Sequence, residues 1–140
     1  PEKVLSLPMK KLKQLIRPAG FYNQKAKRLK LITKKYIELK PKLSSLSTEE
    51  VRKELLSVKG VGNETADSIL LYAFNRPVFV VDAYTKRFCE HFNLFTGKTY
   101  HDYQQFFEKN LPRDQYIFNE YHALIVRWAK EHANRKRKTI

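Results

Sequence analysis

One aspartate in this chain has the type and the position to do chemistry. Asp82 follows the apolar run VFVV at residues 78–81 and precedes a helical pattern. Asp is a favoured N-cap, so capping that helix is the simplest role for it. A carboxylate at a helix start beside a cleft could also stabilise positive charge that develops on a reacting group, or deprotonate a water. The residue types alone leave both roles open, and one side chain can hold both.

A pair of glycines is the second candidate. Gly60 and Gly62 stand in the sequence VKGVG, residues 58–62, between two helical patterns. Glycine reaches backbone conformations closed to other residues and lets another chain approach closely. The helix that begins near Asn63 has free amide hydrogens and a positive dipole end, which together favour phosphate. A bare Gly-x-Gly is more often a simple tight turn. Here the apolar helices on both sides favour a phosphate-binding hairpin, with Val61 packed into the core.

The charge balance points to a polyanionic partner. The 140 residues include 28 Lys and Arg against 14 Asp and Glu, a net charge of +14. Such an excess favours nucleic acid first and an acidic membrane surface second. A single cysteine excludes a disulfide framework and fits a reducing compartment. No apolar run approaches the ~20 residues that span a bilayer, and the first residues lack the zones of a signal peptide.

The elements that position these residues are predicted to be helices throughout. Apolar spacing of three and four predicts helices over residues 23–39, 47–56, 63–74, 82–91, 99–110 and 114–133. Asn23, Ser47 and Thr99 are the expected N-caps, the last two within capping boxes. The buried faces are expected to hold Leu29, Ile32, Tyr36 and Leu39, then Ala66, Ile69, Leu70 and Ala73, then Ile117, Tyr121, Leu124, Ile125 and Trp128. Only PVFVV, residues 77–81, resembles a strand, and it has no partner.

Three stretches together resemble a known family. LLSVKGVGNETA at residues 55–66 is similar to the helix-hairpin-helix of the endonuclease III superfamily of base-excision DNA glycosylases. GFYNQKA at residues 20–26 and PVFVVD at residues 77–82 match other segments of that family. The resemblance extends from about Met9 to Trp128. It implies an all-α fold of two helical lobes with the cleft between them. The lobes would be residues 1–81, with the hairpin at about 48–74, and 82–140, with the family's N-terminal helices missing.

The resemblance also implies roles for particular residues. Asp82 aligns with the carboxylate that the active members of the superfamily use. The DNA backbone would be held by Lys59, Gly60, Val61, Gly62, Asn63 and Thr65. Tyr22 and Tyr84 would be pocket aromatics, and Phe21 a further aromatic near the site, although burial in the core is the safer interpretation for any one of the three. Family resemblance also allows a monovalent cation at the hairpin carbonyls.

Two departures from the family pattern narrow the activity and the cofactors that the resemblance implies. Bifunctional members, which form a Schiff base, carry a lysine two residues after the second glycine, where this chain has Glu64. A carboxylate cannot act as an amine nucleophile, and neither Lys59 nor Lys86 holds the family's position. The four cysteines of the family's iron–sulfur cluster are absent, so no cluster and no other metal is expected. Cys89 is expected in the core, and His91, His101, His122 and His132 are not expected to be ligands.

The resemblance thus predicts a monofunctional glycosylase for alkylated purines such as 3-methyladenine. Its partner would be double-stranded DNA with a damaged base, and it would work as a monomer in the bacterial cytoplasm, at the nucleoid and not at a membrane. Two alternatives stay open: a non-catalytic helix-hairpin-helix DNA-binding protein, and a glycosylase for mismatched adenine, thymine or uracil. The basic tail, residues 134–140, could contact phosphate or be a solvated end.

Overall fold

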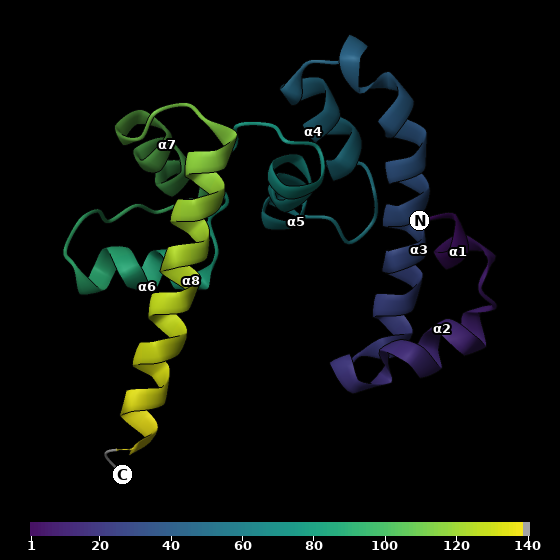
Figure 1. The fold of residues 1–140 in the computed structure, drawn as a ribbon, viewed down its shortest axis with the longest axis horizontal. Coiled ribbons are helices and arrows are strands. Elements are labelled where there is room, and N and C mark those ends of the chain that lie inside the picture. The colour runs from purple at the N-terminus through teal and green to yellow at the C-terminus, as the bar shows by residue number, and fades with distance from the viewer. Residues whose placement is uncertain (139–140) are drawn as a thin grey trace. The chain divides into compact units, whose positions relative to one another are not determined.

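The described part of the chain is helical, as the apolar periodicity predicts (Figure 1). The computed structural model describes the backbone of residues 1–138 and the side chains of residues 1–133. Within this range no residue forms a β-strand. None of the described helices is long and apolar enough to cross a membrane. The basic tail, residues 134–140, lies outside the described side chains.

The chain divides into two compact units, Pro1–Gly62 and Asn63–Ile140. Each unit is described by itself. Residues 63–81 belong with the second unit because the π-helical turn Ile69–Ala73 packs against the last long helix. The lobes expected from the family, residues 1–81 and 82–140, therefore differ from these compact units and stay a prediction.

The first unit is built on one long helix. Its elements are α1 (Glu2–Ser6), α2 (Met9–Ile16), the 3-10 helix Arg17–Ala19, α3 (Tyr22–Leu39), the 3-10 helix Lys40–Ser45 and α4 (Thr48–Leu56). Helices α1, α2 and α4 pack against α3 (Figure 1). The Lys30 ammonium of α3 donates to the carbonyls of Leu5 and Leu7. These bonds tie the end of α1 and the chain that follows it to the long helix.

The buried face of α3 differs from the predicted one. Leu39 is buried as expected, but Leu29 is exposed, while Ala26 and Thr33 are buried. A stripe counted from large apolar residues overlooks Ala26, which has only one methyl group to bury, and Thr33, whose hydroxyl donates to the Leu29 carbonyl at 2.6 Å. The helix also starts one residue before the expected cap Asn23, and Phe21 precedes it with φ of +47°.

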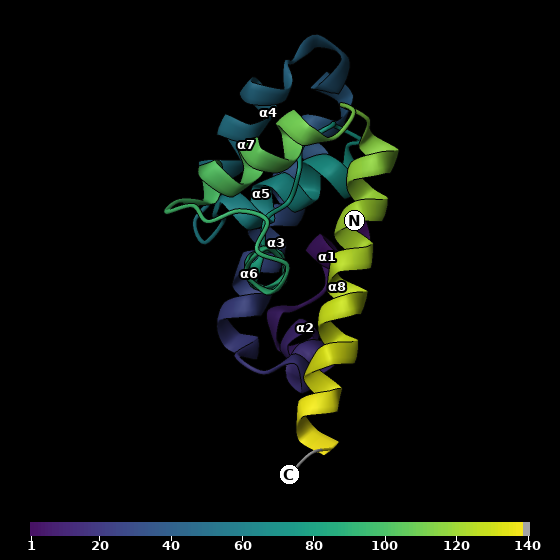
Figure 2. The same cartoon turned by 90° about the vertical axis from the view of Figure 1, so that its left-hand side faces the viewer.

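The second unit has an aromatic core. Its elements are α5 (Asn63–Ser68), the π-helix Ile69–Ala73, α6 (Ala83–His91), α7 (Tyr100–Asn110) and α8 (Gln115–Lys138). The ring of Phe79 stacks on Phe107 with centroids 4.4 Å apart and meets the edge of Phe118 at 5.7 Å. Cys89 is fully buried in the same cluster, as predicted. Helix α8 crosses α6 and packs against it (Figures 1 and 2).

The buried stripe of α8 is rotated from the predicted one. Phe118, His122, Ile125 and Ala129 are its buried residues, whereas Leu124 is 59% exposed and Ile117 only half-buried. Ala73, expected on the buried face of the preceding helical segment, is exposed as well. Counting apolar residues alone shifted the α8 stripe by one position, because a histidine occupies one of the core positions.

The predicted N-caps are confirmed at two helix starts, and the second of them also forms the predicted capping box. Ser47 Oγ accepts from the Glu50 amide at 3.1 Å at the start of α4. At the start of α7 the Thr99 hydroxyl accepts from the Asp102 amide at 3.1 Å, and the Asp102 carboxylate accepts from the Thr99 amide at 2.8 Å. Short polar side chains at helix starts satisfy amides that have no partner inside the helix, so such caps can be recognised from sequence.

Candidate active site and nucleic-acid interface

The segment that leads to Asp82 is held by side chains of α7 in place of a partner strand. The Phe79 amide donates to Glu108 Oε1 at 3.0 Å, and the Phe79 carbonyl accepts from Gln104 Nε2 at 2.9 Å. The Val81 amide donates to the Tyr100 hydroxyl at 3.3 Å. Tyr100, Gln104 and Glu108 are four residues apart and so lie on one face of α7. The strand-like sequence is therefore extended but unpaired with any strand, since a helix satisfies its backbone.

A buried carboxylate anchors this face of α7. Asp67 on α5 is fully buried, and its Oδ2 accepts from the Tyr100 hydroxyl and from Gln104 Nε2, both at 2.8 Å. The pKa of Glu108, at the other end of the face, is raised because burial disfavours its charged form. The path of residues 79–81, and hence the place where Asp82 emerges, is fixed by this polar network.

Asp82 caps α6 through one carboxylate oxygen. Its Oδ1 accepts from the Thr85 amide at 2.8 Å and from the Thr85 hydroxyl at 2.9 Å, and its own amide donates to Thr85 Oγ1 at 3.2 Å. This reciprocal pair is a capping box. The capping role that the sequence suggested is confirmed, and it uses only one of the two carboxylate oxygens, Oδ1.

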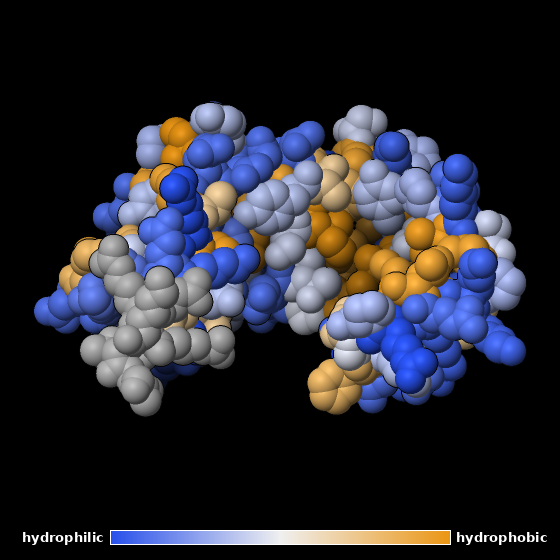
Figure 3. All heavy atoms as spheres, turned by 60° about the horizontal axis from the view of Figure 1, so that its bottom comes forward, coloured by the Kyte–Doolittle hydropathy of each residue, from blue (hydrophilic) through white to orange (hydrophobic). Residues whose placement is uncertain are grey.

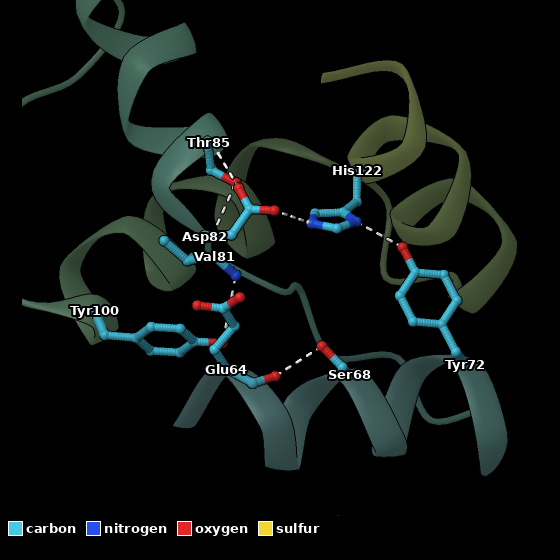
Figure 4. Close-up of polar contacts among 8 residues, drawn as sticks. All are labelled: Glu64, Ser68, Tyr72, Val81, Asp82, Thr85, Tyr100 and His122. Atoms are coloured by element: carbon cyan, nitrogen blue, oxygen red, sulfur yellow. Dashed lines mark hydrogen bonds and ion pairs between the residues drawn. The ribbon is translucent and has the colours of Figure 1, made fainter. Parts of the chain in front are cut away.

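The other oxygen of Asp82 is bonded to a histidine that the sequence did not single out. His122 Nε2 on α8 lies 2.9 Å from Asp82 Oδ2, and the Tyr72 hydroxyl lies 2.6 Å from His122 Nδ1 (Figure 4). The side chains of Asp82 and His122 are only 14% and 11% exposed. Burial alone would raise the pKa of Asp82, but the bonds from His122 and Thr85 outweigh it and place that pKa below its usual range. Asp82 is thus held as a carboxylate.

The position of His122 carried a signal that apolar counting missed. It stands four residues after Phe118 and three before Ile125, so it shares their buried face. A buried polar side chain needs a hydrogen-bond partner. A histidine on a core stripe therefore predicts a bonded partner, although sequence spacing cannot identify one 40 residues away.

Glu64, which the sequence resemblance aligns with the lysine of bifunctional family members, lies at the start of α5. It is exposed, and its backbone carbonyl accepts from Ser68 Oγ at 2.7 Å. Figure 4 shows the Glu64 carboxylate pointing from α5 toward the segment that ends in Asp82. An acid, not an amine, therefore points toward this side of the second unit.

The glycine loop, residues 57–62, joins α4 to α5 along the chain. The Val61 amide donates to the Val58 carbonyl at 3.1 Å, and Val61 is buried as predicted. Gly60 has φ of +88°, a conformation that side chains disfavour, and a Cβ there would meet Arg28 Nε at 2.6 Å. Gly62 has neither constraint, because nothing lies within 4 Å of the place its Cβ would take.

Several polar groups of this loop and of the next helix start are exposed. Within the described residues, the amides of Gly60 and Gly62 donate to no protein acceptor. Lys59, Asn63 and Thr65 are all exposed. Figure 3 shows both hydrophilic and apolar side chains on the face in view, and the sequence carries a net charge of +14. Free amides and exposed cations suit an anionic ligand.

The aromatics expected near a pocket belong to different units of the chain. Tyr22 is half-buried at the start of α3, with the Arg17 guanidinium 6.0 Å from its ring centroid. Tyr84 is half-buried on α6, with the Arg87 guanidinium at 5.9 Å. Phe21 is 84% exposed, so a core role for it is wrong. The structure describes Tyr22 and Phe21 in the first unit and Tyr84 in the second.

Comparison with known proteins identifies the family of this chain. Residues 1–113 match the HhH-GPD superfamily of base excision DNA repair proteins, so the chain belongs to that superfamily. A protein of Methanocaldococcus jannaschii named "Putative DNA repair glycosylase" is 50% identical over 96% of this chain. Endonuclease III of Buchnera aphidicola is 35% identical over 70% of it. The chain spans 64% of the first relative's length and 45% of the second's.

Solved structures confirm the all-α helix-hairpin-helix glycosylase fold. A crystal structure of H. pylori 3-methyladenine DNA glycosylase (MagIII) bound to 1,N6-ethenoadenine aligns with a TM-score of 0.79 and 30% identity, covering 94% of this chain and 67% of that one. An endonuclease III–DNA complex aligns with a TM-score of 0.62 and 24% identity, covering 80% of this chain and 51% of that one. The predicted resemblance and fold class are therefore confirmed.

Proposed function

We propose that this chain carries the catalytic carboxylate and the DNA-binding hairpin of a base-excision DNA glycosylase. The observation that carries the proposal is the state of Asp82. It is an ionised carboxylate fixed by three donor groups on two elements, and the sequence resemblance aligns it with the family's catalytic carboxylate. Capping α6 needs only the bonds to Oδ1. The bond from His122 to Oδ2 is therefore additional to capping, and it favours a catalytic role over a purely structural one.

In the proposed reaction water replaces a base at C1′ of a deoxyribose. The target nucleotide is first rotated out of the duplex. The C1′–N bond breaks, its electron pair leaves with the base, and positive charge develops on the sugar. The Asp82 carboxylate stabilises that charge, water adds to C1′, and the water's proton is released. Because the pKa of Asp82 is lowered and both oxygens already accept hydrogen bonds, we assign it electrostatic stabilisation in preference to proton abstraction.

The glycine loop would hold the DNA backbone. The free amides of Gly60 and Gly62, with the exposed Lys59, supply donors to a phosphate. Open space at Gly62 supports this role, because no contact within the chain requires a glycine there. Val61 would fix the loop from the core side, while Asn63 and Thr65 would contact DNA from the start of α5. A monovalent cation bridging hairpin carbonyls and a phosphate remains part of the proposal.

We infer that the enzyme is monofunctional, because Glu64 stands where a lyase needs an amine. The reaction would then end at an abasic site, and strand breaks would follow only on alkali treatment. Without a lysine at this position, the strand-nicking step of bifunctional relatives has no nucleophile.

Alkylated purines such as 3-methyladenine are the proposed substrate class. Support comes from the likeness to the H. pylori 3-methyladenine DNA glycosylase. A cationic alkylated base also leaves readily, so it demands little acid catalysis, in keeping with a site built on one ionised carboxylate. Mismatched adenine, thymine or uracil is the alternative within the same reaction.

The test is base release from methylated DNA by the full-length protein. Free bases are measured by chromatography, and the strands are run with and without alkali. Release of 3-methyladenine with breaks only after alkali is the expected result. Release from mismatched or uracil-containing duplexes alone would show that mismatched bases or uracil, and not alkylated purines, are the substrates. Tight DNA binding with no release from any of these duplexes would favour the non-catalytic alternative.

A further inference from the structure

Three groups from three elements form one hydrogen-bonded chain that ends on Asp82. Tyr72 comes from the π-helix Ile69–Ala73, His122 from α8 and Asp82 from the start of α6, with contacts of 2.6 and 2.9 Å (Figure 4). Neither Tyr72 nor His122 is needed for capping, since Thr85 satisfies that role. The chain instead ties the position of Asp82 to two other segments of the unit.

The chemistry of the chain determines which ring nitrogen carries the proton. An ionised carboxylate only accepts, so His122 Nε2 must donate to Asp82. In the neutral ring Nδ1 then accepts, and the Tyr72 hydroxyl donates to it. The pKa of Tyr72 is raised, by burial and then by the negative charge of Asp82, so that hydroxyl keeps its proton. If the ring becomes protonated, Nδ1 donates and the Tyr72 oxygen accepts, so the bond from Nε2 to Asp82 survives.

We propose that His122, oriented by Tyr72, is a positioning residue that keeps Asp82 ionised and in its working orientation. This inference rests on the proposed function for its catalytic meaning. Its physical content, control of the Asp82 proton by His122, can be measured without any enzymatic activity. Because the Tyr72 hydroxyl can donate or accept, the hydrogen bonds of the chain persist in either charge state of the histidine ring.

Other charged groups near Asp82 do not replace this chain. Glu64 on α5 points toward the same side and, being an acid, would disfavour rather than favour the ionised form (Figure 4). On α6 itself the Lys86 ammonium lies 5.7 Å from the ring centroid of Tyr103, and the Arg87 guanidinium lies over Tyr84. Among the described residues, His122 is thus the side chain that donates to Asp82 from outside α6.

The direct test is an acid titration of the Asp82 carboxyl carbon by NMR in the full-length protein. His122→Leu removes the donor, and we expect the Asp82 midpoint to rise by about one pH unit or more. His122→Gln is the matched rescue, because its amide can donate from the place of Nε2 and should bring the midpoint back toward wild type. An unchanged midpoint in folded His122→Leu would overturn the proposal.

Tyr72→Phe gives a second route that does not depend on folding of the leucine variant. Tyr72 is 43% exposed, so loss of its hydroxyl should leave the fold intact. The Asp82 midpoint should rise by a few tenths of a pH unit, because the ring is less firmly oriented. With His122→Leu unfolded, a wild-type midpoint in Tyr72→Phe would reduce the chain to a structural contact and refute the inference.

Single-turnover base release across pH then connects the titration to catalysis. The acid limb of the pH–rate profile should shift to higher pH in His122→Leu, together with the Asp82 midpoint, and should shift back in His122→Gln. A purely structural role would lower the melting temperature without moving that limb. If no protein releases base while the titration behaves as expected, the proposed function fails and the role of His122 in holding the Asp82 charge stands.

Discussion

The Asp82 corner, residues 79–85, and the glycine loop, residues 57–62, differ in whether their polar groups have hydrogen-bond partners within the chain. Both oxygens of Asp82 accept hydrogen bonds, and side chains of α7 satisfy the backbone before it. In the loop, the amides of Gly60 and Gly62 have no protein acceptor among the described residues, and space around Gly62 is open. A charge that acts on a transition state must be fixed before substrate arrives. A loop that holds a phosphate must leave its donors for the ligand.

Changing the charge of Glu64, which faces the Asp82 corner, should have the largest effect. Glu64→Lys supplies an amine where bifunctional relatives carry theirs, so a Schiff base with the sugar becomes possible. Borohydride should trap a covalent protein–DNA complex with this variant and none with wild type, while Glu64→Gln serves as the matched control. A trapped complex with wild type would show that the monofunctional assignment is wrong.

On the loop side, Gly62→Val should weaken DNA binding while leaving stability nearly unchanged. A Cβ at this position has no atom of the chain within 4 Å, so the added side chain is expected to clash mainly with a ligand that approaches the backbone. We expect affinity to fall by about tenfold, in line with the loss of roughly one charge-assisted hydrogen bond. Binding is measured by fluorescence anisotropy at fixed salt, and the melting temperature provides the control. Wild-type affinity would mean that the loop is only a turn.

Gly60→Ala should show the reverse, which is lower stability with DNA affinity nearly unchanged. At φ of +88° an alanine is strained, and its Cβ would also displace the flexible Arg28 side chain. The expected loss of unfolding free energy is about 1 kcal/mol, measured by denaturant titration. Equal stability of Gly60→Ala and Gly62→Val would contradict the distinction between the two glycines.

Removing the charge of Asp82 and removing the charge of Glu108 should change the stability of the fold in opposite directions. Asp82 has a lowered pKa, so its charge stabilises the fold above about pH 4 and that contribution is lost as pH falls through the folded-state pKa. The pKa of Glu108 is raised, so its charge penalises folding at neutral pH and the penalty vanishes in acid. Glu108→Gln keeps the acceptor for the Phe79 amide.

We therefore expect Glu108→Gln to be neutral or slightly stabilising at pH 7, and Asp82→Asn to lose roughly 1 kcal/mol. Both differences from wild type should shrink when unfolding is measured below about pH 4. A loss of stability in Glu108→Gln as large as that in Asp82→Asn would show that the two carboxylates are held in the same way.

Much of the fold could be predicted from the sequence because its signals are local. The helices, the caps at Ser47, Asp82 and Thr99, and the buried Cys89 all follow from neighbouring residues. Long-range pairing could not be predicted in the same way. The partner of the extended segment proved to be a helix face, and the partner of Asp82 a histidine 40 residues away. For the same reason the apolar pattern wrongly predicts Leu124 in the core, because only tertiary packing reveals that His122 lies on the buried stripe of α8.

The central claim is that Asp82 performs chemistry in addition to capping α6. The most direct measurement is single-turnover base release by wild type and Asp82→Asn at saturating protein, with folding and DNA affinity measured on the same samples. The amide keeps an acceptor for the Thr85 amide but removes the charge. We predict that Asp82→Asn folds, binds DNA at least as tightly, and releases base at least about 100-fold more slowly. Base release at the wild-type rate, or loss of folding in parallel with loss of release, would contradict the account.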